Sequence, residues 1–189
     1  AGKKVQIDLN DMDYISWKRA LDEDLENLAL LISMVQDITP EYDFKLSELY
    51  RIIREKIASP LNPGNRKILV FTAFADTAEY LYENVSRMAQ RELGLNTALV
   101  TGSVDGKTTA SKIKADMNHV LTCFSPKSKD RDLLYPDLKE DIDILIATDC
   151  ISEGQNLQDC DFCVNYDIHW NPVRIIQRFG RIDRIGSQN

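Results

Sequence analysis

The feature that most constrains the fold of this chain is a series of four short apolar runs with helical segments between them. The runs are KILVFTAF (67–74), TALVTG (97–102), IDILIATD (142–149) and DFCVNYD (161–167). Runs of this length, rich in branched and aromatic residues, are typical of strands that are buried on both faces of a sheet. Because strands that alternate with helices form a parallel sheet covered on both faces, the sequence predicts a three-layer α/β domain with a mainly parallel sheet.

Two amphipathic helices are expected before the first strand. Residues 14–36 and 42–58 carry apolar side chains at spacings of three and four, which is the helical repeat. The stretch SPLNPGNRK (59–67) then brings several turn signals together. We therefore expect an N-terminal helical segment at residues 1–60, followed by the α/β domain at residues 61–189.

The helices between and after the strands have recognisable ends. Asp76 and Glu79 form a capping-box pattern for a helix after the first strand, and the apolar spacing in residues 107–124 predicts another helix. The charged stretch 125–142 predicts a loop with at most one helical turn. Asn171 and Pro172 suit the cap and the first residue of a last helix, which Gly180 is expected to end in a left-handed conformation.

The composition of the chain limits which binding partners and which cellular compartment can be expected. The chain has 189 residues, a formal net charge of -7 and four cysteines, which are too few and too unevenly placed for a disulfide framework. The net charge argues against broad adhesion to nucleic acid or to an anionic membrane, so any nucleic-acid contact is expected from a local patch. No stretch approaches the ~20 apolar residues of a membrane helix. We expect a cytoplasmic protein without a membrane partner, and a piece of a longer protein because the chain starts at Ala1.

Polar residues follow each predicted strand. They are Thr72, Thr101 to Ser103, Thr148 and Asp149, and Asp167 to Asn171. The carboxyl ends of parallel strands lie at one edge of a sheet, and ligands bind beyond that edge. The sequence therefore predicts that these residues lie together at a ligand-binding edge.

Three further motifs are weaker candidates. VDGKTT (104–109) resembles the end of a phosphate-binding loop, but Thr101 stands where that loop needs a glycine, so a free-standing ATPase is a lesser alternative. LDEDLE (21–26) follows no buried strand and fits the outer face of a helix better than a magnesium motif. Cys160 and Cys163 form one C-x-x-C pair without a second pair, so buried thiols are favoured over a zinc site and no metal site is predicted.

The chain closes on four arginines, which are Arg174, Arg178, Arg181 and Arg184. The solvated basic face of an amphipathic helix is one explanation for them. The residues between them are apolar, namely Ile176, Phe179, Ile182 and Ile185. We therefore expect the segment to lie against a core and to hold guanidinium groups that bind phosphate oxygens bidentately, as phosphoryl transfer requires. Since the chain has no convincing phosphate loop, the nucleotide is expected to be held mainly by other sequence.

Two of these segments carry a resemblance to a known family. ATDCISEGQNLQ (147–158) resembles motif V, and QRFGRIDRIG (177–186) resembles motif VI, of superfamily 2 helicases and nucleic-acid translocases; KILVFTAF and TALVTGS are similar to motif IV and the strand and loop after it. The resemblance covers residues 43–186 and implies a C-terminal RecA-like lobe. NYDIHWNP (165–172) resembles the Swi/Snf-related branch, and most of all bacterial ATPases of the RNA-polymerase-recycling type. Ser152 and Glu153 stand where eukaryotic remodellers carry a glycine doublet, which argues against nucleosome remodelling.

The resemblance implies the second lobe of an ATP-dependent helicase or translocase, which closes over ATP and Mg²⁺ held mainly by an N-terminal RecA-like lobe. By match to motif VI, Arg181 and Arg184 would reach the γ-phosphate, and Gln177 would couple that site to the nucleic acid. By match to motif V, Gly154 and Asn156 would lie near the nucleotide. The isolated chain is then expected to be inactive as an ATP hydrolase.

The same resemblance implies contacts with the phosphates of the tracked strand. They would come from Thr72, Thr101, Gly102, Ser103 and Thr148, small groups that hold a strand without reading its bases. The implied partners are DNA, with the double-stranded form favoured and RNA left open, the N-terminal lobe, and RNA polymerase or another protein. The implied location is the bacterial cytoplasm, at the nucleoid. The alternative is a catalytically silent module that docks another protein through the helices of residues 14–58.

Overall fold

The computed structural model describes residues 10, 12–36, 38–102, 106–151, 155–168 and 171–182. They belong to two compact units, Ala1–Phe44 and Lys45–Asn189. Among the described residues, no helix combines the length and the apolar character needed to cross a membrane.

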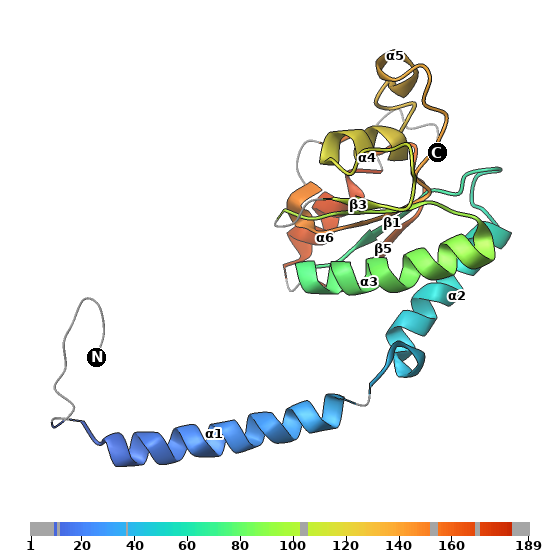
Figure 1. The fold of residues 1–189 in the computed structure, drawn as a ribbon. Helices are drawn as coiled ribbons and strands as arrows, with labels where there is room; N and C mark the ends of the chain where they lie inside the picture. Colours follow the sequence, from blue (N-terminus) through green and yellow to red (C-terminus); the bar gives the residue numbers. More distant parts are fainter. Residues whose placement is uncertain are drawn as a thin grey trace. The chain divides into compact units, whose positions relative to one another are not determined.

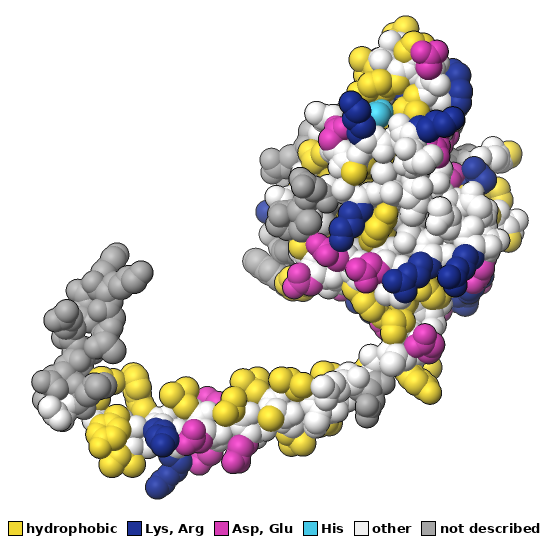
Figure 2. Space-filling model, in the orientation of Figure 1, with side chains coloured by type: hydrophobic (Ala, Val, Ile, Leu, Met, Phe, Trp, Pro, Cys, Tyr) yellow, Lys and Arg dark blue, Asp and Glu magenta, His cyan; other side chains and the backbone are white. Residues whose placement is uncertain are grey.

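The first unit contains the helix α1 (Tyr14–Val35) and a short 3-10 helix (Pro40–Tyr42). The carboxylate of Asp13 caps α1 by accepting a hydrogen bond of 3.1 Å from the N–H of Ser16. No residue of α1 is buried, and its apolar side chains, including Leu21, Leu25 and Leu28, remain exposed along the helix (Figure 2). The helix predicted at residues 14–36 is therefore confirmed, and LDEDLE lies within it.

The second unit is built on a five-stranded sheet with the order β3-β2-β4-β1-β5 (Figure 1). The strands are β1 (Ile68–Phe71), β2 (Thr97–Val100), β3 (Lys107–Thr108), β4 (Ile144–Ala147) and β5 (Cys163–Asn165). Four of them are parallel, and only β3 runs antiparallel to its neighbour β2. Ala147 pairs with both Phe71 and Val100, so β1, β2 and β4 end at the same level.

Helices cover both faces of this sheet. The longer ones are α2 (Phe44–Ala58), α3 (Ala75–Met88), α4 (Met117–Phe124) and α6 (Pro172–Phe179), and α5 (Arg131–Leu134) is a single turn. Alternate residues of β1 point to opposite faces: Val70 packs with α2 and α3, whereas Phe71 packs with α4. The three-layer α/β fold with a mainly parallel sheet is therefore confirmed.

Helix α2 is part of the same compact unit as the sheet, although the sequence placed the boundary after it, at residue 60. Leu46, Leu49 and Ile53 of α2 are buried in the core under the sheet. The ammonium of Lys56 lies 2.7 Å from the carboxylate of Asp161, with both side chains almost completely buried. Turn signals mark where a helix ends, but they do not say what the helix packs against.

The segment before α4 differs from its prediction as a helix. Residues 107 and 108 form β3, and α4 begins only at Met117, where the carboxylate of Asp116 accepts a hydrogen bond of 3.0 Å from the N–H of His119. The backbone passes close to itself at Gly106, where a Cβ atom would lie 2.3 Å from the carbonyl oxygen of Ala115. Gly106, which suggested a phosphate loop, is therefore needed for this close approach of the backbone. Lys107 belongs to the edge strand β3, and its ammonium lies 3.3 Å from the carboxylate of Glu79 in α3.

Two predicted helix ends are wrong and one is confirmed. The cap of α3 is Phe74, without a side-chain bond, and Asp76 lies inside the first turn, so there is no capping box. Gly180 has φ -61° and is not left-handed. Asn171 does cap α6, because its Oδ1 accepts a hydrogen bond of 3.0 Å from the N–H of Val173. The remaining short helices are a π-helix (Ala89–Leu93) and a 3-10 helix (Asp149–Ile151).

Candidate functional site

The carboxyl edge of the sheet gathers the threonines that follow the strands. The N–H of Thr72 donates to the carbonyl of Ala147 at 3.0 Å, and the N–H of Thr148 donates to the carbonyl of Val100 at 3.3 Å. Thr101 follows β2 directly at the same level. The structure therefore brings Thr72, Thr101 and Thr148 to one edge, as the strand ends predicted.

The hydroxyl of Thr72 is used inside the protein. The side chain is fully buried, and its Oγ1 donates to the carboxylate of Asp167, which also accepts from the N–H of Ala73 at 3.3 Å and from Lys45 at 2.9 Å. Burial raises the pKa of Asp167, but the bonds from Thr72, Lys45 and Ala73 outweigh it and hold this pKa below its ordinary value. A phosphate contact by Thr72 would require its bond to Asp167 to open.

The end of β2 offers a more open surface. Gly102 is exposed, and a Cβ atom there would lie 3.3 Å from the Cβ of Cys150. Cys150 is exposed too, with its Sγ 3.7 Å from the carbonyl oxygen of Val100. The sequence analysis gave Cys150 no role of its own, although its place directly after a predicted strand was the signal that could have assigned it to this edge. Ser103 lies outside the described residues.

Arg178 is a fully buried residue that holds α6 against the sheet. Its Nε donates to the carboxylate of Asp149 at 2.7 Å, and its Nη1 donates to Asn165 Oδ1 at 2.9 Å and to the carbonyl of Asp167 at 3.3 Å. The guanidinium also lies over the ring of Phe71, 5.1 Å from its centroid. The side chain thus joins α6 to the ends of β1, β4 and β5. Of the four closing arginines, Arg178 is a structural contact, and phosphate binding stays a prediction for Arg181 and Arg184.

The apolar residues of α6 and of the turn that follows it are only partly in the core, and Ile185 lies outside the described residues. Ile182 is 8% exposed, but Ile176 and Phe179 are 69% and 51% exposed. The prediction that these side chains lie against the core is confirmed for Ile182 and wrong for the other two. The buried face of α6 is polar instead, because Arg178 occupies it.

Asn156 and Arg181 are held close together by the backbone. The N–H of Leu157 donates to the carbonyl of Arg181 at 3.1 Å, which joins the turn after β4 to the end of α6. Arg181 is partly exposed, and Asn156 Oδ1 accepts from the N–H of Gln158 at 3.3 Å. Within the part of the chain that the structure describes, the two segments that resemble motifs V and VI therefore meet at this edge.

Gln177 supplies a further polar group in α6, four residues before Arg181 in the sequence. Its Oε1 is buried and accepts no hydrogen bond from any described residue. An unsatisfied buried amide oxygen suits a ligand that carries a hydrogen-bond donor. Gly154 and Arg184 lie outside the described residues.

The described residues offer little for a metal ion. They contain no group of three His, Cys, Asp or Glu side chains that could hold one. Burial raises the pKa of Cys160 and of Cys163 to about 12, and the Sγ of Cys160 lies 3.2 Å from the carbonyl oxygen of Phe162. Since zinc binds thiolates, these thiols suit packing better than coordination. Asp149, which could have served Mg²⁺, is paired with Arg178.

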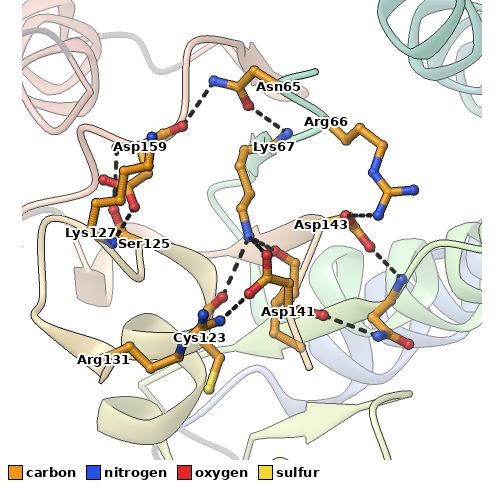
Figure 3. A network of polar contacts seen from close by, with 12 residues as sticks. Asn65, Arg66, Lys67, Cys123, Ser125, Lys127, Arg131, Asp141, Asp143 and Asp159 are labelled. Carbon is orange, nitrogen blue, oxygen red and sulfur yellow. Dashed lines mark hydrogen bonds and ion pairs between the residues drawn. The ribbon is translucent and has the colours of Figure 1, made fainter. Parts of the chain in front are cut away.

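A second polar region lies at the opposite edge, by the amino ends of β1 and β4 (Figure 3). The buried ammonium of Lys67 donates to the carbonyl of Ile142 at 2.8 Å and lies 3.4 Å from Asp141, while burial lowers its pKa. A cavity of about 680 Å³ opens there, between Arg66 and Asp159. Arg66 lies 3.1 Å from Asp143, and Lys67 lies 3.4 Å from Asp141, so both cations are already paired with carboxylates. None of the predicted site residues that the structure describes lines this cavity.

Residues 45–186 match the family model of the helicase conserved C-terminal domain. Because the match covers most of the chain, the chain belongs to this family, and the resemblance of its motifs to superfamily 2 helicases is confirmed. The three-layer α/β fold described above is therefore that of a helicase C-terminal domain.

Among its relatives are helicases of much greater length. The chain is 53% identical over 47 residues to the uncharacterized ATP-dependent helicase YqhH of Bacillus subtilis, covering 25% of this chain and 8% of the relative. It is 26% identical over 122 residues to the ATP-dependent DNA helicase mph1 of Sclerotinia sclerotiorum, covering 65% of this chain and 9% of the relative. The crystal structure of the C-terminal part of the Fun30 ATPase domain aligns at 17% identity and a TM-score of 0.48, over 91% of this chain and 51% of that one. The chain thus spans a small part of the curated relatives it matches.

Proposed function

We propose that this chain is the second motor lobe of an ATP-dependent DNA translocase or helicase of the Swi/Snf-related branch. The observation that carries the proposal is the backbone hydrogen bond of 3.1 Å between Leu157 and Arg181. It brings Asn156, on the nucleotide side by resemblance, to the start of the segment that holds Arg181 and Arg184. A motor lobe needs these groups together, because one side orients the nucleotide and the other neutralises its phosphates.

In this proposal, the chain completes a nucleotide site that is built chiefly by the N-terminal lobe. Arg181 and Arg184 supply positive charge to the γ-phosphate, and the buried oxygen of Gln177 accepts a hydrogen bond from the nucleotide or the facing lobe. Gly154 and Asn156 contact the nucleotide from the turn after β4. Mg²⁺ is held by the other lobe, since Asp149 is occupied by Arg178.

The DNA contacts are proposed at the carboxyl edge of the sheet. The backbone and hydroxyl groups of Thr101, Gly102, Ser103 and Thr148 would hold phosphates of one strand, which fits translocation without sequence preference. Thr72 would contribute after release from Asp167. The exposed glycine gives a phosphate room to approach the backbone. RNA polymerase is a proposed protein partner on resemblance alone, and the bacterial nucleoid is the proposed location.

The proposal is tested by ATP hydrolysis of the full-length protein with and without double-stranded DNA. Arg181→Ala and Arg184→Ala should each reduce DNA-stimulated hydrolysis by about 10³-fold, the lower end of the range for arginines that contact a transferring phosphoryl group. Arg87→Ala, which removes an exposed arginine from α3, serves as the control and should leave the rate unchanged. Full activity in both test variants would contradict the roles of the two arginines, whereas a wild-type protein without DNA-stimulated hydrolysis would support the silent docking module.

A further inference from the structure

The loop at residues 125–130, between α4 and α5, is tied to the turn at residues 155–159. The carboxylate of Asp159 accepts hydrogen bonds from the N–H of Lys127 at 2.6 Å and from the N–H of Ser128 at 3.0 Å, and from the Ser128 hydroxyl. The N–H of Asp159 donates in return to Ser125 Oγ at 3.3 Å. Figure 3 shows Asp159 next to Lys127 and Ser125. One carboxylate therefore fixes the far end of the turn to the loop.

A second bond fixes the near end of the same turn. The ammonium of Lys129 donates to the side-chain oxygen of Gln155 at 2.7 Å. A hydrogen bond from a charged donor is stronger than one between neutral groups, so this contact restrains Gln155 more than an amide pair would. We call the bonds of Lys129 to Gln155 and of Asp159 to residues 125–128 the clamp.

The backbone next to Lys129 is held in an unusual conformation. Asp130 has φ 50° and is the only described residue other than glycine with a positive φ. The left-handed region is uncommon for such residues and persists where surrounding contacts determine it. Here the N–H of Lys129 donates to the carbonyl of Ser125 at 3.1 Å and the N–H of Arg131 to that of Pro126 at 2.9 Å. These hydrogen bonds fix the backbone of the loop in the conformation in which the Lys129 side chain contacts Gln155.

The clamped turn carries Asn156, which the proposed function places at the nucleotide, and it is bonded to the backbone of Arg181. Asn156 follows Gln155 directly, and the N–H of Leu157, midway between the two clamped ends, donates to the carbonyl of Arg181. A turn fixed at residues 155 and 159 cannot shift without breaking one of these bonds. The hydrogen bonds thus form a continuous path from the loop to the backbone of Arg181, which is the physical requirement for coupling.

We propose that Lys129 and Asp159 are positioning residues that fix the turn at residues 155–159 and, through it, the arginine segment that begins at Arg181. Neither side chain contacts the nucleotide in this role. The inference rests on the proposed function, because it assigns the clamp to the same site. It adds that the loop after α4, which carries no helicase motif, sets the rate at which ATP is hydrolysed.

The test uses Lys129→Met in the full-length protein, with Lys127→Met as the matched control. Lys127 lies in the same loop and enters the clamp only through its backbone N–H. Lys129→Met should lower kcat for DNA-stimulated ATP hydrolysis about tenfold with little change in KM, since a 1 Å misplacement of a catalytic group costs up to about 10²-fold. Lys129→Arg should restore most of kcat, and Lys127→Met should match the wild type.

Two further measurements keep the proposal testable. In the Arg181→Ala background, Lys129→Met should have no additional effect on kcat, because residues that act through one group are not additive. Asp159→Asn should lower kcat in the same way while thermal unfolding shows that the protein is folded. A kcat for Lys129→Met equal to that of Lys127→Met, or an additive effect with Arg181→Ala, would overturn the positioning role. A wild type without DNA-stimulated hydrolysis would instead overturn the proposed function.

Discussion

Arg178→Met is the substitution that best tests the buried polar contact between α6 and the sheet. The guanidinium is fully buried and donates to Asp149, Asn165 and the carbonyl of Asp167. Methionine fills similar volume over Phe71 but leaves the carboxylate of Asp149 without its partner. Breaking a buried ion pair by removing one partner costs about 3–5 kcal/mol. Because 24% of the Asp149 side chain remains exposed to solvent, we expect the lower end, about 3 kcal/mol.

The assay is urea unfolding of the purified chain, followed by circular dichroism. The midpoint should fall while the slope of the free energy of unfolding against urea stays unchanged. In a thermal scan the same loss corresponds to a decrease in Tm of roughly 6–12 °C, at about 2–4 °C per kcal/mol for a chain of this size. Arg87→Met, on the exposed side of α3, should change stability by less than about 0.5 kcal/mol.

A second variant separates loss of the pair from loss of packing. Adding Asp149→Asn to Arg178→Met removes the unpaired carboxylate, and so the double variant should recover part of the lost stability. A loss below about 1 kcal/mol for Arg178→Met, or strictly additive effects in the double variant, would contradict the assignment of Arg178 as a buried structural contact.

Two other perturbations probe the fold around the site. Lys56→Met should cost about 3 kcal/mol, because it leaves the buried carboxylate of Asp161 without its cation; urea unfolding measures it, and an unchanged midpoint would contradict a role for this pair in holding α2. Asp167 has a folded-state pKa below its ordinary value of 3.8, so the stability it contributes is present above that pH and is lost as pH falls through the folded-state pKa. Asp167→Asn should make the free energy of unfolding depend less on pH in this acid range. An unchanged dependence on pH would exclude this contribution.

The centre of the sheet could be predicted because each of its three strands is a continuous apolar run. β5 was also predicted as a buried strand, but it lies at the edge of the sheet and is only partly buried. β1, β2 and β4 are buried on both faces, and burial of that kind leaves a direct mark on composition. β3 leaves none, since it has two polar residues and depends on pairing with β2. Its apolar neighbours Ile113 and Met117 also fit a helical repeat, and a local pattern cannot show that Gly106 must pass close to Ala115.

The candidate site could be predicted as a place but not as a set of roles. The ends of parallel strands located Thr72, Thr101 and Thr148 at one edge. The match to motif VI assigned Arg181 and Arg184 to the γ-phosphate but gave Arg178 no role of its own. Its structural role depends on Asp149, which comes from a distant part of the chain. The contact of Lys129 with Gln155 could not be predicted either, because the two residues are far apart in the chain and belong to no common motif.

The short strand β3 has a consequence for how copies of this lobe meet. It closes one side of the sheet with only two residues, one of which is Lys107. An edge strand of two residues exposes few unpaired backbone N–H and C=O groups. The positive charge of Lys107 also disfavours pairing with the β3 edge of a second copy. Crowded copies of the protein therefore cannot easily extend their sheets into one another here, and aggregation from this side is disfavoured.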